Sequence, residues 1–195
     1  MRVTALKETK GGRVALSMDG AYTASLDMLT VGEYGLCVGD ELDDEKLAEI
    51  LRLSQSRRAK SRAIDLLSYR PHTAAELRQK LLRKSTEEDA DAAVARMEEL
   101  GMIDDREFAL RYAEELFSRK GYGEKRVKLE MQKKGLSRED IDAALEAKPD
   151  ERDLIRELLH GKLSRFRDDP EKLASRLLSR GFAWDDVSAV LREEE

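Results

Sequence analysis

The chain has 195 residues, of which 39% are charged and only 5% aromatic, so it has little material for one large hydrophobic core. No apolar run approaches the roughly 20 residues of a membrane span, and no signal-peptide pattern opens the sequence, so we expect a cytoplasmic protein. The single cysteine, Cys37, excludes an internal disulfide and is expected to be a small buried hydrophobe. Abundant Ala, Leu, Glu, Lys and Arg favour helices, and together these features predict a row of small helical bundles.

The N-terminal segment differs in pattern from the rest of the chain. Three short strands are predicted, at residues 3–6, 13–18 and 22–26. Gly11-Gly12 indicates a hairpin connection between the first two, and Asp19-Gly20 is a second turn signal. A helix is expected over residues 43–53, with its apolar residues on one side. Residues 1–53 are therefore predicted to form a small α+β extension.

After residue 53, apolar residues recur at offsets of 46 to 51 residues, and such a period is typical of a repeat array. First helices share the sets Ala59/Ala63/Leu67, Ala109/Ala113/Phe117 and Ile155/Leu159/Leu163. Second helices share the pairs Leu77/Leu81, Val127/Met131 and Leu173/Leu177. Third helices share Ala90/Ala93/Val94, Ile141/Ala144/Leu145 and Val187/Val190/Leu191. The predicted fold is mainly α, with three tandem three-helix bundles in an elongated array, at residues 54–103, 104–148 and 149–195.

Start and stop signals fit these helices. Side chains suited to capping a helix N-terminus precede the apolar patterns at Thr73, Thr86, Asp104, Ser137 and Asp169. Pro170 suits the first position of a helix, and Gly121 and Gly135 follow predicted last turns, where a left-handed residue closes a helix. Arg70-Pro71 is expected to end the first helix of the first repeat, because the residue before proline avoids the helical region.

Charge alternates along the repeats, although the net charge of the chain is only −5. Residues 51–84 hold ten basic and two acidic side chains, and residues 85–118 hold three and eleven. Residues 119–138 return to a net charge of +6, residues 139–160 to −5 and residues 161–180 to +3. Each repeat therefore has a basic region at its first and second helices and an acidic third helix.

Two interpretations of the basic regions stay open. Cations at helix ends complement the helix dipole, and roughly half of the pattern has this structural cause. Residues 119–138 contain more basic side chains than the helix dipoles require. A basic stripe of this kind suits a polyanion or an acidic protein groove. The predicted partner-binding residues are Arg70, Arg78, Arg83, Lys84, Arg119, Lys120, Lys125, Arg126, Lys128, Lys133 and Lys134.

Catalysis finds little support in the sequence. His72 and His160 are far apart, with no carboxylate or cysteine at ligand spacing, and both are expected to be solvent-facing or structural. Gly121-x-Gly123 lacks the third glycine and the preceding strand of a phosphate-binding loop. We therefore expect no catalytic residue, no metal and no cofactor.

Three segments of the sequence resemble the RecX family of bacterial recombination regulators. They read LSYRPHTAAELRQKL at residues 67–81, LGMIDDREFA at 100–109 and RVKLEMQKKGL at 126–136, and the resemblance covers about residues 57–192. It implies a non-enzymatic protein that binds the RecA filament and restrains filament growth, ATP hydrolysis, strand exchange and repressor autocleavage in DNA repair and the SOS response. It implies no catalytic residues.

The expected partner is thus the RecA filament, with weak direct contact to DNA as an addition, no membrane contact, and a monomeric chain. The alternative is a DNA-binding protein whose basic second helices contact phosphates, and a general helical-repeat adaptor is a third. The net charge of −5 and the acidic third helices speak against DNA as the main target. Whether this chain inhibits or assists its filament is left open by the sequence.

Overall fold

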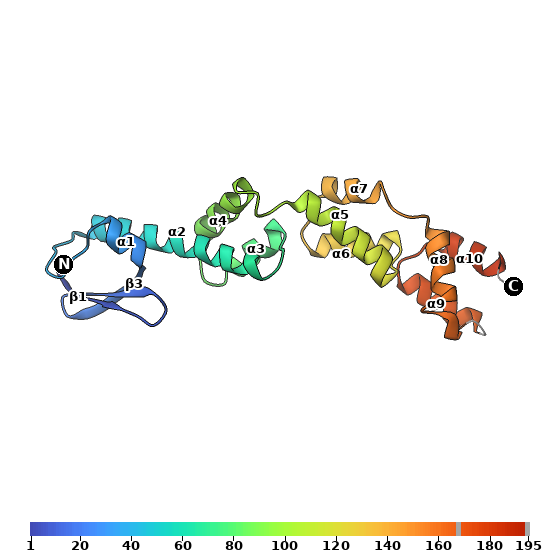
Figure 1. Cartoon of the computed structure of the whole chain (residues 1–195), viewed down its shortest axis with the longest axis horizontal. Coiled ribbons are helices and arrows are strands. Elements are labelled where there is room, and N and C mark those ends of the chain that lie inside the picture. The colour runs from blue at the N-terminus through green and yellow to red at the C-terminus, as the bar shows by residue number, and fades with distance from the viewer. Residues whose placement is uncertain (167–168, 194–195) are drawn as a thin grey trace. The chain divides into compact units, whose positions relative to one another are not determined.

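Short runs of apolar residues begin the chain, and they build a small antiparallel sheet. A computed structural model describes residues 1–166 and 169–193 (Figure 1). The sheet has the order β1-β2-β3, with strands β1 (Val3–Glu8), β2 (Arg13–Met18) and β3 (Ala21–Asp27). Asp19 and Gly20, both with positive φ, make the second hairpin turn. The predicted strands and turns are therefore confirmed, with bounds that differ by one or two residues.

A short helix, α1 (Met28–Glu33), follows β3 directly and was not predicted. The Asp27 side chain accepts a hydrogen bond from the Thr30 backbone N–H at 3.0 Å, which caps this helix. Its six residues include a glycine and are too few to show a helical period, so the spacing of apolar residues did not predict this helix.

One long helix, α2 (Asp44–Tyr69), replaces two predicted elements. The helix expected over residues 43–53 does not end there, because the polar residues that follow include neither glycine nor proline. Ser54 is buried, and its hydroxyl accepts a hydrogen bond from the Asp27 N–H at 2.9 Å, so the polar stretch faces the end of β3. The helix ends before Arg70-Pro71, as the sequence predicts.

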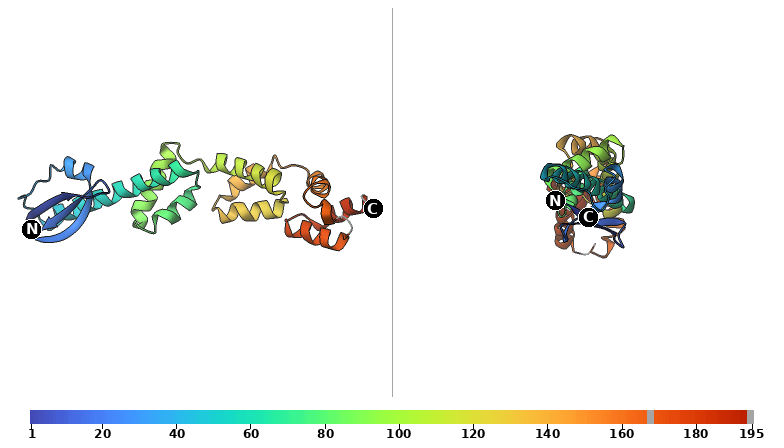
Figure 2. Two further views of the ribbon diagram at one scale, coloured as in Figure 1. Left: turned by 60° about the horizontal axis from the view of Figure 1, so that its bottom comes forward. Right: turned by 90° about the vertical axis from the view of Figure 1, so that its left-hand side faces the viewer.

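The chain divides into two compact units, residues 1–70 with 77–102, and residues 71–76 with 103–195. In the first unit, the sheet lies against the N-terminal end of α2 (Figure 2). Its core consists of apolar side chains from the strands, the following loop and α2, namely Val3, Leu16, Met18, Leu26, Leu36, Leu47 and Ile50. The C-terminal half of α2 packs against α4 (Glu87–Glu99), where Ala59, Ala63, Ala90 and Ala93 are buried. Alanine at these positions lets the two helices approach closely.

The second unit contains the helices of the second and third repeats. They are α5 (Asp105–Glu115) with a π-helical turn η1 (Leu116–Lys120), α6 (Glu124–Lys133), α7 (Arg138–Leu145), α8 (Glu151–His160), a 3-10 turn η2 (Ser164–Phe166), α9 (Pro170–Ser179) and α10 (Trp184–Glu193). The side chains of Asp104, Ser137 and Asp169 accept hydrogen bonds from backbone N–H groups at 2.8, 3.0 and 3.1 Å. The predicted N-caps are thus confirmed.

Helix α3 (Ala74–Leu81) is the second helix of the first repeat, and its cap is confirmed too. Thr73 Oγ1 accepts a hydrogen bond from the Glu76 N–H at 3.1 Å. The apolar pairs of all three second helices are buried, and so are most of the apolar sets of the first and third helices. The prediction of three recurring three-helix units is therefore confirmed for the described residues, and after residue 60 these contain no strand.

Two expectations fail on burial. Separate thin cores were expected for each repeat, but the buried side chains from α5 to α10 form one continuous cluster, since glycines let the second and third repeats touch through their backbones. Cys37 was expected to be buried, and it is exposed. It lies in the loop after α1, where its backbone N–H donates a hydrogen bond to the Asp40 carboxylate at 2.7 Å. The neighbouring Leu36 occupies the core position instead.

The four-part division at residues 53, 103 and 148 remains a prediction. Within the described ranges, every helix is too short or too polar to span a lipid bilayer.

Candidate partner-binding site

Most of the predicted cations on α6 already have acidic partners within the second unit. Arg126 and Lys133 lie 2.9 and 3.1 Å from Glu130, and Lys128 lies 3.6 Å from Asp142. An exposed ion pair of this kind contributes less than about 1 kcal/mol, but it still compensates the charge locally. The helix face therefore offers less free positive charge than the sequence alone suggests.

Lys134 has a structural role. Its Nζ lies 2.6 Å from Glu76 and 5.7 Å from the centre of the Tyr112 ring, and its backbone carbonyl accepts a hydrogen bond from the Thr73 hydroxyl at 2.6 Å. These contacts tie the end of α6 to residues 71–76 of the same unit. Close packing adds to them, because a Cβ on Gly135 would overlap the side chain of Ala75.

Three of the predicted cations behave differently. Arg119, Lys120 and Lys125 are exposed, and none forms an ion pair with any residue in the ranges 1–166 and 169–193. Arg119 and Lys120 end the π-helical turn and open onto a cavity of about 490 Å³. The cavity is lined by Arg119, Lys120, Tyr122, Arg126, Lys162, Arg176, Ser179 and Arg180, which we call the unit-2 basic cavity. Six of these eight side chains are cationic, and no carboxylate is among them.

Backbone carbonyls at the end of η1 hold two of the six cations. Lys162 Nζ donates to the Arg119 carbonyl at 2.5 Å, and Arg180 Nη1 donates to the carbonyls of Lys120 and Gly121 at 2.6 and 3.2 Å. The last carbonyls of a helix carry partial negative charge and have no intrahelical partner, so cations are favoured there. This explains how several like charges are held together without an acid between them.

Glycines bring the two repeats together at this point. Gly123 N–H donates to the Arg180 carbonyl at 2.9 Å, and a Cβ on Gly123 would lie 2.6 Å from the Phe182 nitrogen. Gly181 has φ +94, and a Cβ there would overlap the backbone of Arg126. We call this contact the glycine seam. It places the start of α6 beside the end of α9, so cations about sixty residues apart in sequence share one cavity.

Aromatic rings fix two of the cavity arginines. The guanidinium carbon of Arg126 lies 5.5 Å from the centre of the Tyr122 ring, and that of Arg176 lies 3.9 Å from the centre of the Phe166 ring. A guanidinium over an aromatic face is attracted to it and loses little further freedom when it binds an anion.

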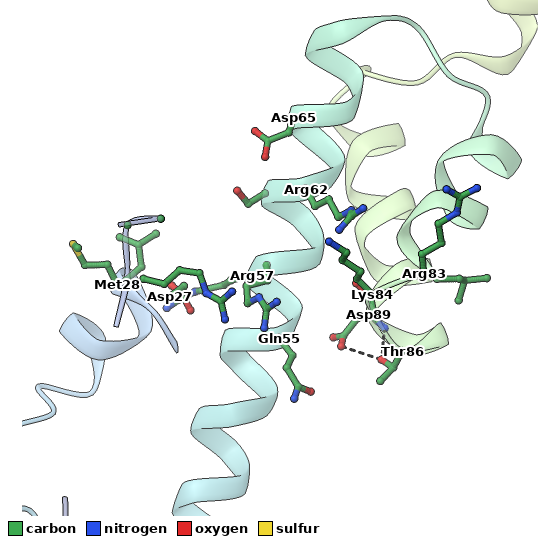
Figure 3. Close-up of a pocket in the computed structure, with 18 residues that line it drawn as sticks. Asp27, Met28, Gln55, Arg57, Arg62, Asp65, Arg83, Lys84, Thr86 and Asp89 are labelled. Carbon is green, nitrogen blue, oxygen red and sulfur yellow. Dashed lines mark hydrogen bonds between the residues drawn. The ribbon is translucent and has the colours of Figure 1, made fainter. Parts of the chain in front are cut away.

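The four predicted cations of the first unit have different surroundings. Arg78 pairs with Asp91 at 2.5 Å, and this hydrogen bond holds the pKa of Asp91 below its usual value. Arg83 and Lys84 are exposed in the turn between α3 and α4 and line a separate cavity (Figure 3). Arg70 lies exposed after the end of α2.

The sequence missed Lys162, Arg176 and Arg180 as site residues. In the sequence, Arg180 is one of the cations at a predicted helix end, which the helix dipole already explains, and Lys162 and Arg176 belong to the weakly basic residues 161–180. Neither histidine lies in the site. His72 is buried just before α3, as expected of a structural histidine, and His160 is exposed to solvent. Among the described residues, no group of three His, Cys, Asp or Glu side chains is placed to hold a metal ion.

Comparison with known proteins agrees with the helical repeats. Residues 59–97 match the family model "RecX, first three-helix domain" and residues 104–145 match "RecX, second three-helix domain". The regulatory protein RecX of Lactobacillus delbrueckii subsp. bulgaricus is 30% identical, over 95% of this chain and 72% of the relative. The chain belongs to the RecX family. RecX of Cronobacter sakazakii is 32% identical over 74% of this chain and 96% of its own.

Solved structures give the same result. A crystal structure of a regulatory protein RecX covers 100% of this chain and 99% of its own, with a TM-score of 0.70 and 25% identity. The crystal structure of RecX from Lactobacillus salivarius has a TM-score of 0.63 at 23% identity over 71% of this chain, which supports the fold. RecX proteins are regulatory proteins by name, and the predicted family is confirmed.

Proposed function

We propose that this protein is a non-enzymatic cytoplasmic regulator that binds the RecA nucleoprotein filament and restrains its assembly, ATPase, strand exchange and coprotease activities. Membership of the RecX family supports a regulatory role. The observation that carries the contact itself is the unit-2 basic cavity, with six cations and no acidic lining residue.

The chemistry of this cavity suits an acidic protein surface. Cations that are already held by carbonyls and aromatic rings lose little side-chain entropy on binding, which lowers the cost of association. Charge complementarity then sets orientation and association rate more than raw affinity. We assign the contact mainly to Arg119 and Lys120, which line the cavity and form no ion pair with the described residues. We expect Lys125, which lies outside this cavity, to contribute less, and also Arg126 and the other predicted cations that internal acids compensate.

The test is a double charge reversal, Arg119→Glu with Lys120→Glu. Neither side chain makes an ion pair within residues 1–166 and 169–193, so helical circular dichroism should not change. We expect inhibition of RecA ATPase on single-stranded DNA to fall at least tenfold in potency. The matched control is Lys7→Glu with Lys10→Glu, an equal charge change at exposed positions of the first unit, which should inhibit normally. Normal inhibition by the folded Arg119/Lys120 variant would rule this contact out.

DNA binding is the second candidate, because phosphates also suit a basic cavity. The two candidates separate when DNA is raised until it saturates both proteins at fixed RecA. A protein that only competes for DNA loses its inhibition there, whereas one bound to the filament keeps it and follows the ratio of regulator to RecA. We expect inhibition to persist and to need less than one regulator per RecA protomer.

A further inference from the structure

A second basic cavity lies wholly within the first unit and is independent of the proposed filament contact. It has a volume of about 900 Å³ and lies between the β1–β2 hairpin, α2 and the turn that joins α3 to α4 (Figure 3). Its cations come from all three of these elements, and we call it the unit-1 basic cavity. They are Arg13, Arg57, Arg58, Arg62, Arg83 and Lys84.

One of these cations is already compensated. Arg57 pairs with Glu33 and donates to the Thr30 hydroxyl at 3.1 Å. The side chains of Arg58, Arg62, Arg83 and Lys84 form no ion pair with residues 1–166 and 169–193. Figure 3 shows Arg62 and Lys84 directed towards one another across the space between α2 and the α3–α4 turn.

Three acidic residues also line the cavity, and two of them accept hydrogen bonds in helix caps. Asp27 caps α1 through the Thr30 N–H, and Asp89 accepts a hydrogen bond from the Thr86 hydroxyl at 2.9 Å in the cap of α4. Asp65 lies one turn beyond Arg62 on α2 and forms no ion pair with the part of the chain that the structure describes. These carboxylates keep their charge, so the six cations and three acids of the lining leave the cavity with a net charge of +3.

Two buried donors lack an acceptor. The Nε atoms of Arg13 and Arg62 are buried and make no hydrogen bond within the described residues. A buried charged donor without an acceptor destabilises the fold, and native proteins rarely leave one. Burial, together with the nearby charge of Arg13, also lowers the pKa of Arg58. Buried guanidinium groups with a net positive charge around them favour the binding of an anion.

We propose that the unit-1 basic cavity binds a ligand carrying two or more linked phosphate groups. Guanidinium groups match phosphate oxygens through paired N–H donors, and arginine dominates here. A single carboxylate would compensate only one of the three net positive charges, whereas linked phosphates place several negative charges within one ligand. The volume lies in the range typical of small-ligand sites. The phosphates come either from a free nucleoside triphosphate or from successive phosphodiesters of a single nucleic-acid strand.

The test measures binding of three probes to the whole protein by calorimetry: tripolyphosphate, ATP and a short oligothymidylate. The variant is Arg58→Gln with Arg62→Gln, and the control is Arg52→Gln with Lys60→Gln, the same charge change on α2 outside the cavity. We expect saturable binding of at least one probe, weakened at least tenfold in the variant and unchanged in the control. Thermal stabilisation by the probe should be lost in the same variant.

The pattern of binding identifies the source. Binding of tripolyphosphate and ATP without the oligonucleotide assigns free polyphosphate, and oligonucleotide binding that tripolyphosphate displaces assigns a strand backbone. The proposal is overturned if no probe binds, if the variant binds as well as the wild type, or if polyglutamate binds as tightly. RecA inhibition by Arg58→Gln/Arg62→Gln reports on the filament contact separately, so either proposal can fail alone.

Discussion

The two basic cavities have the same sign of charge but are stabilised differently. In the second unit, Lys162 and Arg180 donate hydrogen bonds to carbonyls at the end of η1, and Arg126 and Arg176 lie over aromatic rings. In the first unit, the backbone supplies one such acceptor, the Ser25 carbonyl for Arg13 at 3.0 Å. The Nε atoms of Arg13 and Arg62 are buried without a hydrogen bond, as is that of Arg126 in the second unit, but within the described residues only Arg126 has a carboxylate, Glu130, at 2.9 Å.

This difference shows that the number of basic residues in a cavity does not determine how favourably the cavity binds an anionic partner. A cavity whose cations are held by the protein itself is prepared for a partner at little internal cost. A cavity whose cations repel one another without compensation is less stable when empty and gains more from a bound anion. The following experiments separate these two cases.

The largest effect is expected at the glycine seam. Gly181→Ala adds a Cβ that overlaps the backbone of Arg126, at a residue with φ +94. We expect it to lower the free energy of unfolding by about 2–4 kcal/mol, from clash and left-handed strain together. Urea denaturation of the purified protein measures the change.

Gly101→Ala is the matched control for this variant. Gly101 also has positive φ, +66, but a Cβ there meets no atom within 4 Å. It should lower the free energy of unfolding by only about 1 kcal/mol. Equal losses in the two variants would mean that the close approach of the repeats adds nothing to stability.

A neutral substitution should have opposite effects in the two cavities. Arg180→Gln removes a charged donor from two carbonyls and should lower the free energy of unfolding by about 1–2 kcal/mol. Arg62→Gln removes an uncompensated charge and should raise it by about 0.5–1 kcal/mol. Urea titrations at low salt show the contrast best, and a loss in both variants would contradict the comparison.

Two carboxyl groups, one in each unit, should change the pH dependence of the unfolding free energy, and this is the smallest expected effect. Hydrogen bonds from Thr30 and Ser54 and the charge of Arg57 lower the pKa of Asp27 below its ordinary value, although burial alone would raise it. Stability from Asp27 is present above pH about 4 and lost as the pH falls through its folded pKa. Asp27→Asn should therefore lower stability at pH 7, by less than about 1 kcal/mol, and make no difference in strong acid.

Asp105 should show the reverse dependence. Burial raises its pKa, against a hydrogen bond from the Ala74 N–H at 3.0 Å that lowers it. The folded state is therefore favoured below pH about 4, and this advantage is lost as the pH rises through the folded pKa. Asp105→Asn should be slightly more stable than wild type at pH 7 and equal to it near pH 3. Thermal melts across this range measure both variants, and parallel pH profiles would contradict the assignment.

Local signals predicted most of the fold. Caps such as Asp104 and stops such as Gly135 act through neighbours within a few residues, so the sequence alone contains the whole interaction. The continuity of α2 was missed because Ser54 faces the end of β3, which is distant in sequence. Cys37 was misjudged for the same reason, since the core position beside it is taken by Leu36.

The candidate site was only partly predictable. The block around Arg119 and Lys120 was visible as a local excess of charge. Its partners Lys162 and Arg180 were not, because their place depends on the glycine seam and on carbonyls that a π-helical turn exposes. The sequence drew attention to Gly123 only as part of an incomplete phosphate-binding loop, whereas in the structure it allows close contact with Gly181 and Phe182.

Because α2 is one continuous helix, its two halves have a fixed rotation about the helix axis, and the first unit depends on this rotation. Arg13 reaches the unit-1 basic cavity from the sheet, whereas Arg83 reaches it from the α3–α4 turn, which lies beside the middle of α2 (Figure 3). One residue inserted between Leu53 and Ser54 turns one half of α2 by about 100° relative to the other. Such an insertion separates the contacts of Ser54 and Arg57 with β3 and α1 from the core contacts of Leu47 and Ile50. The sheet can then follow only one half of α2, so Arg13 and Arg83 no longer face the same side of the helix. The cavity thus depends on helical phase, which length-altering changes in α2 disturb and substitutions do not.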